Sequence, residues 1–345
     1  METSQFFQYK TYIHATVPRV DCTIHGPHIA KVPWARSGSG FTLLFESWVV
    51  ELAKHISVSK IGSMVGEHDT RLWRFLHHYV EEARKLEDYS KTEAIGIDET
   101  SKKGHNYITV VADLIEKKVI HIASGKDYTT VNSFSEDFKA HNGRAENISV
   151  VTCDMSLGFR KGIRENFPNS SMVIDKFHVI KHANEAVDAV RKKESKENPV
   201  LKKTKYLWLK NEGNLTDKQL EKKKSLCKKR LKTSRAYAMR VTLQEIYETS
   251  TDCDQAETAL KRLCSWMMRS RLEEMKRLAK MIREHWGEIL NYFKYRCTNA
   301  LMEGLNSVIQ NVKRRARGFR NDEYFKTIIF LSCGKLDFDS IVLQA

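Results

Sequence analysis

Two aspartates each follow a strand-like apolar run, and this arrangement is suited to metal-ion chemistry. The run at residues 94–97 leads into Asp98, and the run at residues 148–153 leads into Asp154. Two such strands side by side would hold both carboxylates at one rim of a sheet. Mg2+ prefers hard carboxylate oxygens, and two ions about 4 Å apart can support in-line displacement at a phosphodiester. The two aspartates therefore predict phosphoryl-transfer chemistry.

A late helix carries a third candidate carboxylate. The helix is predicted to begin near Asn299, with a buried stripe made of Leu301, Leu305, Val308 and Val312. A second stripe, at steps of three or four residues, contains Glu303, Asn306, Gln310, Lys313 and Arg317. If this face looks into the site, Glu303 completes the metal cage, and the amide and cations beyond it hold backbone phosphates. Taken alone, the pattern favours an amphipathic helix with an ordinary polar face.

The three acids indicate a metal site mainly through their order along the chain. One aspartate at a strand end means little, but two on strands of the right order, followed by a late glutamate on a helix, form a more specific signal. Glu99, Asp113 and Asp175 are nearby competitors for the same roles. Acids at such positions more often cap helices or stay exposed.

Alternating strand and helix patterns predict the sheet that would hold these acids. Strand-like runs at residues 94–101, 107–112 and 119–123 come first, and a helix near 131–141 follows. The strand before Asp154, a helix through 159–167, a strand at 171–175 and a helix at 179–191 complete the pattern. Three antiparallel strands followed by βαβ units describe a mixed sheet covered by helices. This is the order of a ribonuclease-H-like domain.

The charge of the chain indicates a polyanionic partner. The 345 residues carry a formal net charge of +15 and have a pI near 9.4, which makes nucleic acid the leading candidate. A basic ribosome-associated or membrane-surface protein is the alternative. No apolar run approaches the roughly 20 residues that span a bilayer, and the N-terminus lacks a signal pattern. We therefore expect a cytoplasmic protein.

The segment 200–298 is predicted to be a basic, all-helical insertion between the sheet and its last catalytic helix. All five prolines lie at or before Pro199. The segment holds 24 Lys and Arg against 12 Asp and Glu, an excess of about +12. Helical patterns run through residues 218–232 and 259–293. A solvated charged face is the usual meaning of such runs, but the local excess favours a surface for DNA phosphates.

Residues 40–90 predict a helix-turn-helix. An apolar stripe contains Leu44, Trp48, Leu52 and Ile56; a short second helix ends at Gly66; a third helix runs from Asp69 to about Lys85. The third helix would enter the major groove and present Arg71, Arg74, His77 and His78 to DNA. A plain three-helix packing unit with solvated charges is the alternative. We expect Trp48 and Trp73 to be core residues.

Residues 6–35 predict short strands and turns, with runs at 12–17 and 22–28. Cys22 and His25 stand before a Gly-Pro turn, as in one knuckle of a zinc ribbon. A closed site needs four ligands, and no upstream pair is present. An incomplete or metal-free remnant is therefore favoured over intact zinc binding. The other six of the seven cysteines are expected to be ordinary residues, because disulfides are rare in the cytosol.

Several motifs resemble the ISL-three (ISL3) family of bacterial insertion-sequence transposases. They are the runs at 96–99, 151–156, 175–179 and 299–306, and the basic run from Lys313 to Phe319. The resemblance covers almost the whole chain, including Cys22, His25 and the helix-turn-helix. It implies a ribonuclease-H-like fold interrupted by a helical insertion, and an Asp-Asp-Glu triad that maps onto Asp98, Asp154 and Glu303.

The resemblance also implies an activity and partners. Such an enzyme cleaves phosphodiester bonds at the ends of its mobile element and joins the 3′-OH ends to target DNA, using Mg2+ or Mn2+, expected as two ions. The partners are double-stranded DNA, as terminal inverted repeats and target, and a second copy of the chain, because two ends must be paired. Arg314 joins the basic run. The role of His178 stays open between phosphate contact and structural hydrogen bonding.

The chain departs from the family pattern at its start, where members carry a fuller zinc ribbon with an upstream cysteine pair. The expected order is a zinc-ribbon remnant at 1–39, the helix-turn-helix at 40–90, the first part of the catalytic core at 91–199, the insertion at 200–298 and the final helices at 299–345. Two other functions stay open. One is a repurposed or catalytically silent DNA-binding protein, and the other is a ribonuclease-H-like nuclease without strand transfer.

Overall fold

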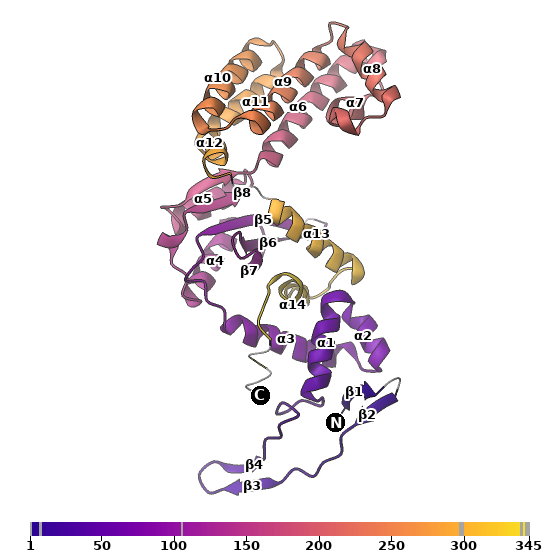
Figure 1. Cartoon of the computed structure of the whole chain (residues 1–345), viewed down its shortest axis with the longest axis vertical. Helices are drawn as coiled ribbons and strands as arrows, with labels where there is room; N and C mark the ends of the chain where they lie inside the picture. Colours follow the sequence, from indigo (N-terminus) through magenta and orange to yellow (C-terminus); the bar gives the residue numbers. More distant parts are fainter. Residues whose placement is uncertain (1, 7–8, 105, 297–299, 339–340, 342–345) are drawn as a thin grey trace. The chain divides into compact units, whose positions relative to one another are not determined.

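The computed structural model describes residues 2–6, 9–104, 106–296, 300–338 and 341 (Figure 1). The chain forms two compact units, Met1–Asn147 with Ala300–Ala345, and Ile148–Asn299. The larger sheet is mixed and five-stranded, in the order β7-β6-β5-β8-β9. Its first three strands belong to the first unit and its last two to the second. The predicted mixed α/β sheet is thus confirmed.

Two short hairpins begin the first unit. Strand β1 (Glu2–Phe6) pairs with β2 (Tyr9–Tyr12), and β3 (Arg19–Cys22) pairs with β4 (Gly26–Ile29). The strand predicted at 12–17 is not formed, because β2 ends at Tyr12 and the residues up to Pro18 have no regular structure. The run at 22–28, predicted as a mixture of strand and turn, contains the end of β3, the turn and most of β4.

Three helices follow, as expected for residues 40–90. They are α1 (Leu43–His55), α2 (Val58–Val65) and α3 (Asp69–Lys85). Gly66 ends α2 in the left-handed region, with φ +73°, and its N–H donates to the carbonyl of Gly62. Glycine is the residue that adopts this conformation without strain. The predicted apolar face of α3 is confirmed, since Leu72, Trp73, Leu76, Tyr79 and Val80 are all buried.

The buried face of α1 differs from the prediction by one residue. Phe45, Val49 and Ala53 are fully buried, whereas Leu44 is 61% exposed and Trp48 is only partly buried against the core. Both stripes are apolar and differ by about 100° around the helix. The contacts of α1 with α3 and α14 determine which of the two stripes is buried. The sequence pattern alone could not determine this.

The first three strands of the sheet are β5 (Ala94–Lys103), β6 (Asn106–Asp113) and β7 (Lys118–Ser124). They pair antiparallel, with Asp98 opposite Val110. Helix α4 (Tyr128–Ala140) packs on β7, and the short turn Ala145–Asn147 follows. The order of these elements matches the prediction.

Two C-terminal helices complete the first unit, α13 (Ala300–Arg315) and α14 (Asp322–Cys333). One continuous apolar core joins the three N-terminal helices, β6, β7, α13 and α14. The predicted buried stripe of α13 was wrong at Val308, which is 40% exposed, while Ile309 is fully buried. Both residues are apolar, and packing on the sheet decides which one turns inward.

The second unit contains the two parallel strands β8 (Val150–Cys153) and β9 (Ser171–Ile174). Helix α5 (Leu157–Asn166) connects them, and α6 (Lys176–Glu197) follows β9. This βαβα order is the one predicted from residues 148–191.

The rest of the second unit is helical in the residues that the structure describes (Figure 1). The helices are α7 (Lys205–Leu209), α8 (Asp217–Cys227), α9 (Lys232–Thr249), α10 (Cys253–Arg269), α11 (Glu273–Glu284) and α12 (Trp286–Tyr295), with short turns at Pro199–Leu201 and Glu212–Asn214. The single helical pattern at 259–293 is divided into three helices. Arg271 interrupts it in the left-handed region, with φ +59°.

Helix α6 extends from the sheet into this helical part and contacts α9 and α11. The buried carboxylate of Glu194 accepts hydrogen bonds from the backbone N–H groups of Lys232 and Thr233. A carboxylate at a helix start satisfies N–H groups that have no intrahelical acceptor. In the described residues, no helix is long and apolar enough to cross a membrane.

Candidate active site

The predicted acidic site begins on strand β5, where α13 lies against Asp98. The side-chain amide of Asn306 donates to Oδ2 of Asp98 over 2.7 Å, and the backbone N–H of Glu99 donates to Oδ1 over 2.8 Å. Asp98 is half-buried. Two donors therefore hold this carboxylate in one orientation at the surface of the sheet.

Helix α13 continues along β5 in the same direction. The Gln310 amide donates to the Thr100 hydroxyl over 2.8 Å, and the Lys313 ammonium donates to the carbonyl of Ser101 over 2.7 Å. Four residues of helix rise about 6 Å, and two residues of strand rise about 6.6 Å. The two repeats nearly match, so side chains spaced four apart on the helix meet alternate residues of the strand.

Gly96 allows the helix to approach at the start of this contact. A Cβ atom at Gly96 would lie 2.8 Å from Cγ of Met302, closer than real Cβ contacts. Gly96 and Asp98 lie on the same face of β5, because alternate residues of a strand share a face. The close approach at Gly96 therefore brings α13 against the face that carries Asp98.

Glu303 lies three residues before Asn306 on α13 and is exposed. Residues three or four apart share a helix face, so Glu303 leaves the helix on the side that carries Asn306. The polar stripe predicted on α13 is thus found facing β5 at Asn306, Gln310 and Lys313. Arg317 lies beyond the end of the helix, and Lys313 contacts β5 rather than standing free.

The second unit carries Asp154 and Asp175. Their preceding residues, Cys153 and Ile174, are directly paired in the parallel strands β8 and β9. Both acids therefore lie at the carboxyl edge of this strand pair, and each begins a connection into a helix. Oδ1 of Asp154 accepts from the backbone N–H of Ser156 over 2.8 Å. Asp154 is half-buried, and Asp175 is 2% exposed.

Asp175 and His178 lie at the start of α6. The backbone N–H of His178 donates to the carbonyl of Asp175, and the His178 side chain is half-buried. Burial raises the pKa of Tyr247, and neighbouring Tyr292 and Asp175 raise it further. Asp175 therefore lies near a tyrosine that stays neutral. The sequence identified Asp175 as an alternative metal ligand but gave no sign of this neighbour.

The other two competing acids have partners of their own. Asp113 is buried and accepts hydrogen bonds from the Thr92 hydroxyl and from the backbone N–H groups of Ile115 and Glu116. Glu99 lies 3.8 Å from the Lys126 ammonium. Asp113 therefore stabilises the turn between β6 and β7.

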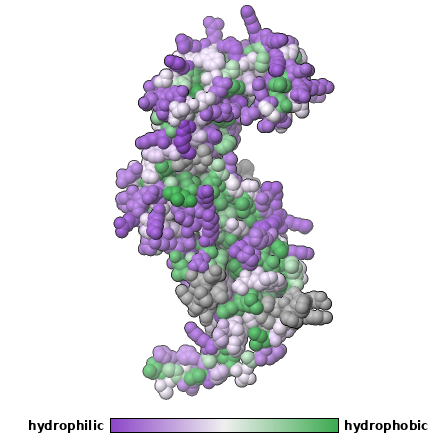
Figure 2. Space-filling model, in the orientation of Figure 1, coloured by the Kyte–Doolittle hydropathy of each residue, from purple (hydrophilic) through white to green (hydrophobic). Residues whose placement is uncertain are grey.

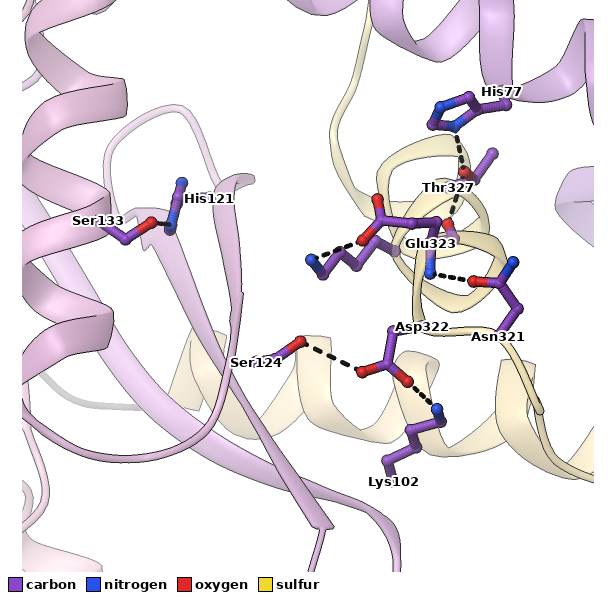
Figure 3. A network of polar contacts seen from close by, with 10 residues as sticks. His77, Lys102, His121, Ser124, Ser133, Asn321, Asp322, Glu323 and Thr327 are labelled. Carbon is purple, nitrogen blue, oxygen red and sulfur yellow. Dashed lines mark hydrogen bonds and ion pairs between the residues drawn. The ribbon is translucent and has the colours of Figure 1, made fainter.

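A network at the end of β5 connects the site to α14 (Figure 3). Lys102 forms an ion pair with Asp322, and the Ser124 hydroxyl donates to the same carboxylate over 3.2 Å. Lys102 and Asp322 are 220 residues apart in the chain. Sequence reasoning missed this pair, and the only local signal was the position of Asp322 in the first turn of a helix.

Cys22 and His25 lie at the turn of the β3–β4 hairpin, with Sγ and Nδ1 3.5 Å apart. Hydrogen bonds from the backbone of Ile24 and His25 lower the pKa of the Cys22 thiol. Among the described residues, no group of three or more His, Cys, Asp or Glu is arranged to hold a metal ion. The structure thus describes one pair of zinc-type ligands at this hairpin.

The outer face of α3 carries the arginines predicted to face DNA. Arg71 and Arg74 are exposed. Arg71 forms an ion pair with Glu67, and its guanidinium lies over the ring of Phe41 at 4.5 Å. Arg71 is therefore held in place by the helix-turn-helix, while the described contacts leave Arg74 at the surface.

The two histidines of α3 are half-buried, unlike its two arginines. Nδ1 of His77 lies 3.2 Å from the Thr327 hydroxyl on α14 (Figure 3). His78 is half-buried, and burial together with the charge of Arg36 lowers its pKa. The expectation that these histidines face DNA is therefore not met for His77, because α14 covers that side of the helix.

The helices of the second unit present a strongly hydrophilic surface (Figure 2). Between residues 202 and 230 the sequence holds 11 Lys and Arg against three acids. Most of these cations are exposed, but Lys223 is 1% exposed and its ammonium lies 3.9 Å from the centre of the Tyr237 ring. The exposed cations between residues 202 and 230 therefore form the predicted basic surface, and the buried Lys223 does not contribute to it.

Comparison with known families agrees with this arrangement. A family model for the helix-turn-helix domain of transposase family ISL3 matches residues 30–80. A second model, described as a transposase and specific for the DDE domain of ISL3, matches residues 95–329. The fold and site define the class as an α/β domain joined to a DNA-binding helix-turn-helix. The chain belongs to the ISL3 family of transposases.

Two relatives illustrate the similarity. The transposase for insertion sequence element IS1557 of Mycobacterium tuberculosis (strain CDC 1551 / Oshkosh) is 26% identical over 359 aligned residues, covering 94% of this chain and 79% of the relative. The transposase for insertion sequence element IS1001 of Bordetella parapertussis is 25% identical over 336 residues, covering 92% of this chain and 80% of the relative.

Proposed function

We propose that the protein cleaves phosphodiester bonds at the ends of an insertion sequence and joins the 3′-OH ends to target DNA. The observation that carries the proposal is the 2.7 Å hydrogen bond from Asn306 to Asp98, in a chain of the ISL3 transposase family. This bond joins the acidic strand to the helix that bears Glu303, and the family supplies the expected chemistry.

In this proposal Asp98, Asp154 and Glu303 hold Mg2+ or Mn2+, expected as two ions. The donor set fits such ions, because all three side chains offer hard carboxylate oxygens and none is fully buried. The chemistry supplied by two divalent ions is activation of the attacking water or hydroxyl and stabilisation of charge on the leaving oxygen.

The protein's own residues orient this acidic set. Asn306 and the Glu99 N–H fix the Asp98 carboxylate, so that its position is set before DNA binds. Gln310 and Lys313 hold α13 along β5, and the same helix carries Glu303. Asn306 is in this sense a positioning residue, because it acts on Asp98 and needs no contact with DNA.

The DNA contacts are assigned to basic side chains on both units. Arg71 and Arg74 on α3 would read the ends of the element, as the last helix of a helix-turn-helix does in the major groove. Arg314 and Arg317, together with the exposed lysines of α8, would hold backbone phosphates. His178 would contact a phosphate or support α6. A dimer on DNA is part of the proposal, because two ends must be brought together.

The test is metal-dependent nicking and joining of a labelled duplex that carries the terminal repeat of the element. Asp154→Asn protein serves as the control. Cutting followed by joining, absent in the control, would support the proposal. Binding without any cut would point to a repurposed DNA-binding protein, and cutting without joining would point to a nuclease.

A further inference from the structure

A cavity of about 650 Å3 lies within the first unit, outside the acidic site. It is lined by the start of α2, by Trp73 of α3, by the linker between α13 and α14, and by Tyr324. Its volume is in the range of roughly 300–1,000 Å3 that small-molecule pockets occupy. The proposed function assigns one lining residue, Arg317, to backbone phosphates, and it gives the cavity itself no role.

Four cations line the cavity against one acid. Lys60, Arg315, Arg317 and Arg320 contribute the positive charge, and Asp69 is the acid. All four cations are exposed. Within the described part of the chain, none of the four has a carboxylate at ion-pair distance, and Asp69 is paired with His68. The lining therefore carries positive charge that the protein itself does not neutralise.

The start of α2 adds donors to the same cavity. Ser57, Val58 and Ser59 line it, and the first backbone N–H groups of a helix have no intrahelical acceptor. The hydroxyl of the N-cap Ser57 makes no capping hydrogen bond, and the first turn of α2 contains no acid. A helix start of this kind favours an anion such as a phosphate.

Aromatic side chains also line the cavity. The ring of Trp73 is stacked on Tyr324, with centroids 4.2 Å apart and planes 3° apart. Phe319 meets Trp73 edge to face at 6.3 Å. Phe319 and Tyr324 are half-exposed. Aromatic rings beside a cationic rim are the two components with which proteins hold single-stranded nucleic acid.

Arg317 is placed at the rim by an unusual backbone conformation. The N–H of Gly318 donates to the carbonyl of Lys313, and the N–H of Arg317 donates to that of Arg314. These two bonds close a Schellman motif at the end of α13. Its left-handed position usually holds glycine, but here it holds Arg317, with φ +55°. Glycine would suit this backbone better, so the guanidinium offers a functional reason for arginine.

We propose that this cavity holds one unpaired nucleotide of a DNA strand. The phosphate binds between the start of α2, Lys60 and Arg317, and the base lies against Phe319 and Tyr324. A base inside a duplex stays stacked and cannot reach the aromatic wall, so the nucleotide must be unpaired. The inference rests on the proposed function, because cutting and joining at element ends is what would present a DNA strand here.

The test measures the DNA affinity of the protein by fluorescence anisotropy, with two labelled DNA probes of the same sequence. One probe is a labelled duplex with a single unpaired nucleotide, and the other is fully paired. Arg317→Gly removes the cation and suits the backbone. Lys117→Gly is the matched control, because Lys117 is also an exposed cation in the left-handed region, with φ +56°, and does not line the cavity.

We expect Arg317→Gly to weaken binding of the unpaired probe about tenfold, as loss of a charge-assisted hydrogen bond does. Binding of the paired probe weakens less, because Arg317 is then only one of several cations on backbone phosphates, and the melting temperature does not fall. Lys117→Gly leaves both affinities unchanged. An equal loss on both probes, or no loss on either, would overturn the inference.

The aromatic wall is tested with Tyr324→Leu and Tyr324→Phe. Removal of the ring weakens binding of the unpaired probe several-fold, because the base loses its stacking partner, whereas phenylalanine keeps the affinity. If Tyr324→Leu fails to fold, Phe319→Leu replaces it. Retained preference for the unpaired probe in a folded wall variant would contradict the inference.

The inference and the proposed function can fail separately. Asp154→Asn should lose cutting and keep the preference for the unpaired probe. If no form of the protein cuts DNA while Arg317→Gly still loses the preference, the cavity stands and the cleavage proposal falls. If the wild-type protein cuts and joins DNA, and the cavity variants bind the unpaired probe and cut DNA as well as the wild type does, the proposed role of the cavity is wrong.

Discussion

The side-chain amide of Asn306 donates a 2.7 Å hydrogen bond to the carboxylate of Asp98, which lies 208 residues earlier in the chain. Together with the Gln310–Thr100 bond and the contact of Met302 at Gly96, it fixes the register of α13 along β5. This register positions the proposed acid Glu303, which lies on the same helix.

Asn306→Ala should lower DNA cutting by about tenfold to a hundredfold, the usual effect of removing a residue that orients a metal ligand. DNA affinity should stay unchanged. The Mg2+ concentration needed for half-maximal cutting should rise, which a merely structural loss would not produce. Asn311→Ala is the matched control, because Asn311 is exposed on the same helix. An unchanged Mg2+ dependence would contradict the positioning role.

Asp98→Asn, Asp154→Asn and Glu303→Gln should each abolish cutting and leave DNA binding largely intact. Each removes a proposed metal ligand, whereas the basic surfaces remain. A nicking assay and a gel-shift assay on one preparation separate the two properties. Glu99→Gln should keep activity, because Glu99 is not assigned to the metal. Full activity in any of the three triad variants would remove that residue from the triad.

Gly96→Ala should lower the melting temperature, because the added Cβ would lie 2.8 Å from Met302. Overpacking of this kind costs about 1–3 kcal/mol, and any displacement of α13 should also lower cutting. Gly304→Ala is the matched control on the helix, where an added Cβ meets nothing within 4 Å. It should raise stability by up to about 1 kcal/mol. Equal melting temperatures for both variants would refute the close approach.

Asp137 should make the free energy of unfolding depend on pH in the acidic range. Burial raises its pKa, but the hydrogen bond from His121 and the charges of Arg84, His121 and His141 outweigh burial, so the folded-state pKa is lowered. Such a carboxylate stabilises the fold above its unfolded pKa of about 3.9, and this contribution is lost as pH falls further through the folded value.

Asp137→Asn should therefore cost about 1–3 kcal/mol near neutral pH and flatten the fall in melting temperature below about pH 4. Thermal unfolding across pH 3 to 7 measures both effects. Glu82→Gln, which breaks the exposed pair with Lys85, should cost less than about 1 kcal/mol. A fall in stability below pH 4 that Asp137→Asn left unchanged would contradict this account.

Much of the fold follows from local patterns in the sequence. The strands around Asp98 and Asp154, the helix that begins near residue 300 and the end of α2 at Gly66 were all predicted, because strand runs, helical periodicity and glycine depend on near neighbours. The polar stripe of Asn306, Gln310 and Lys313 was predicted for the same reason. The stripe was expected to look into the site and hold DNA phosphates; its hydrogen bonds to β5 through Asn306, Gln310 and Lys313 were not predicted.

Only the tertiary structure decided which of two adjacent apolar stripes of α1 is buried, and whether Val308 or Ile309 turns inward. It also decided that His77 contacts α14 and that Lys102 pairs with Asp322 across 220 residues. Residue types and spacing determine which side chains share a face. Contacts between distant segments depend on how those faces pack, and no local pattern records that choice.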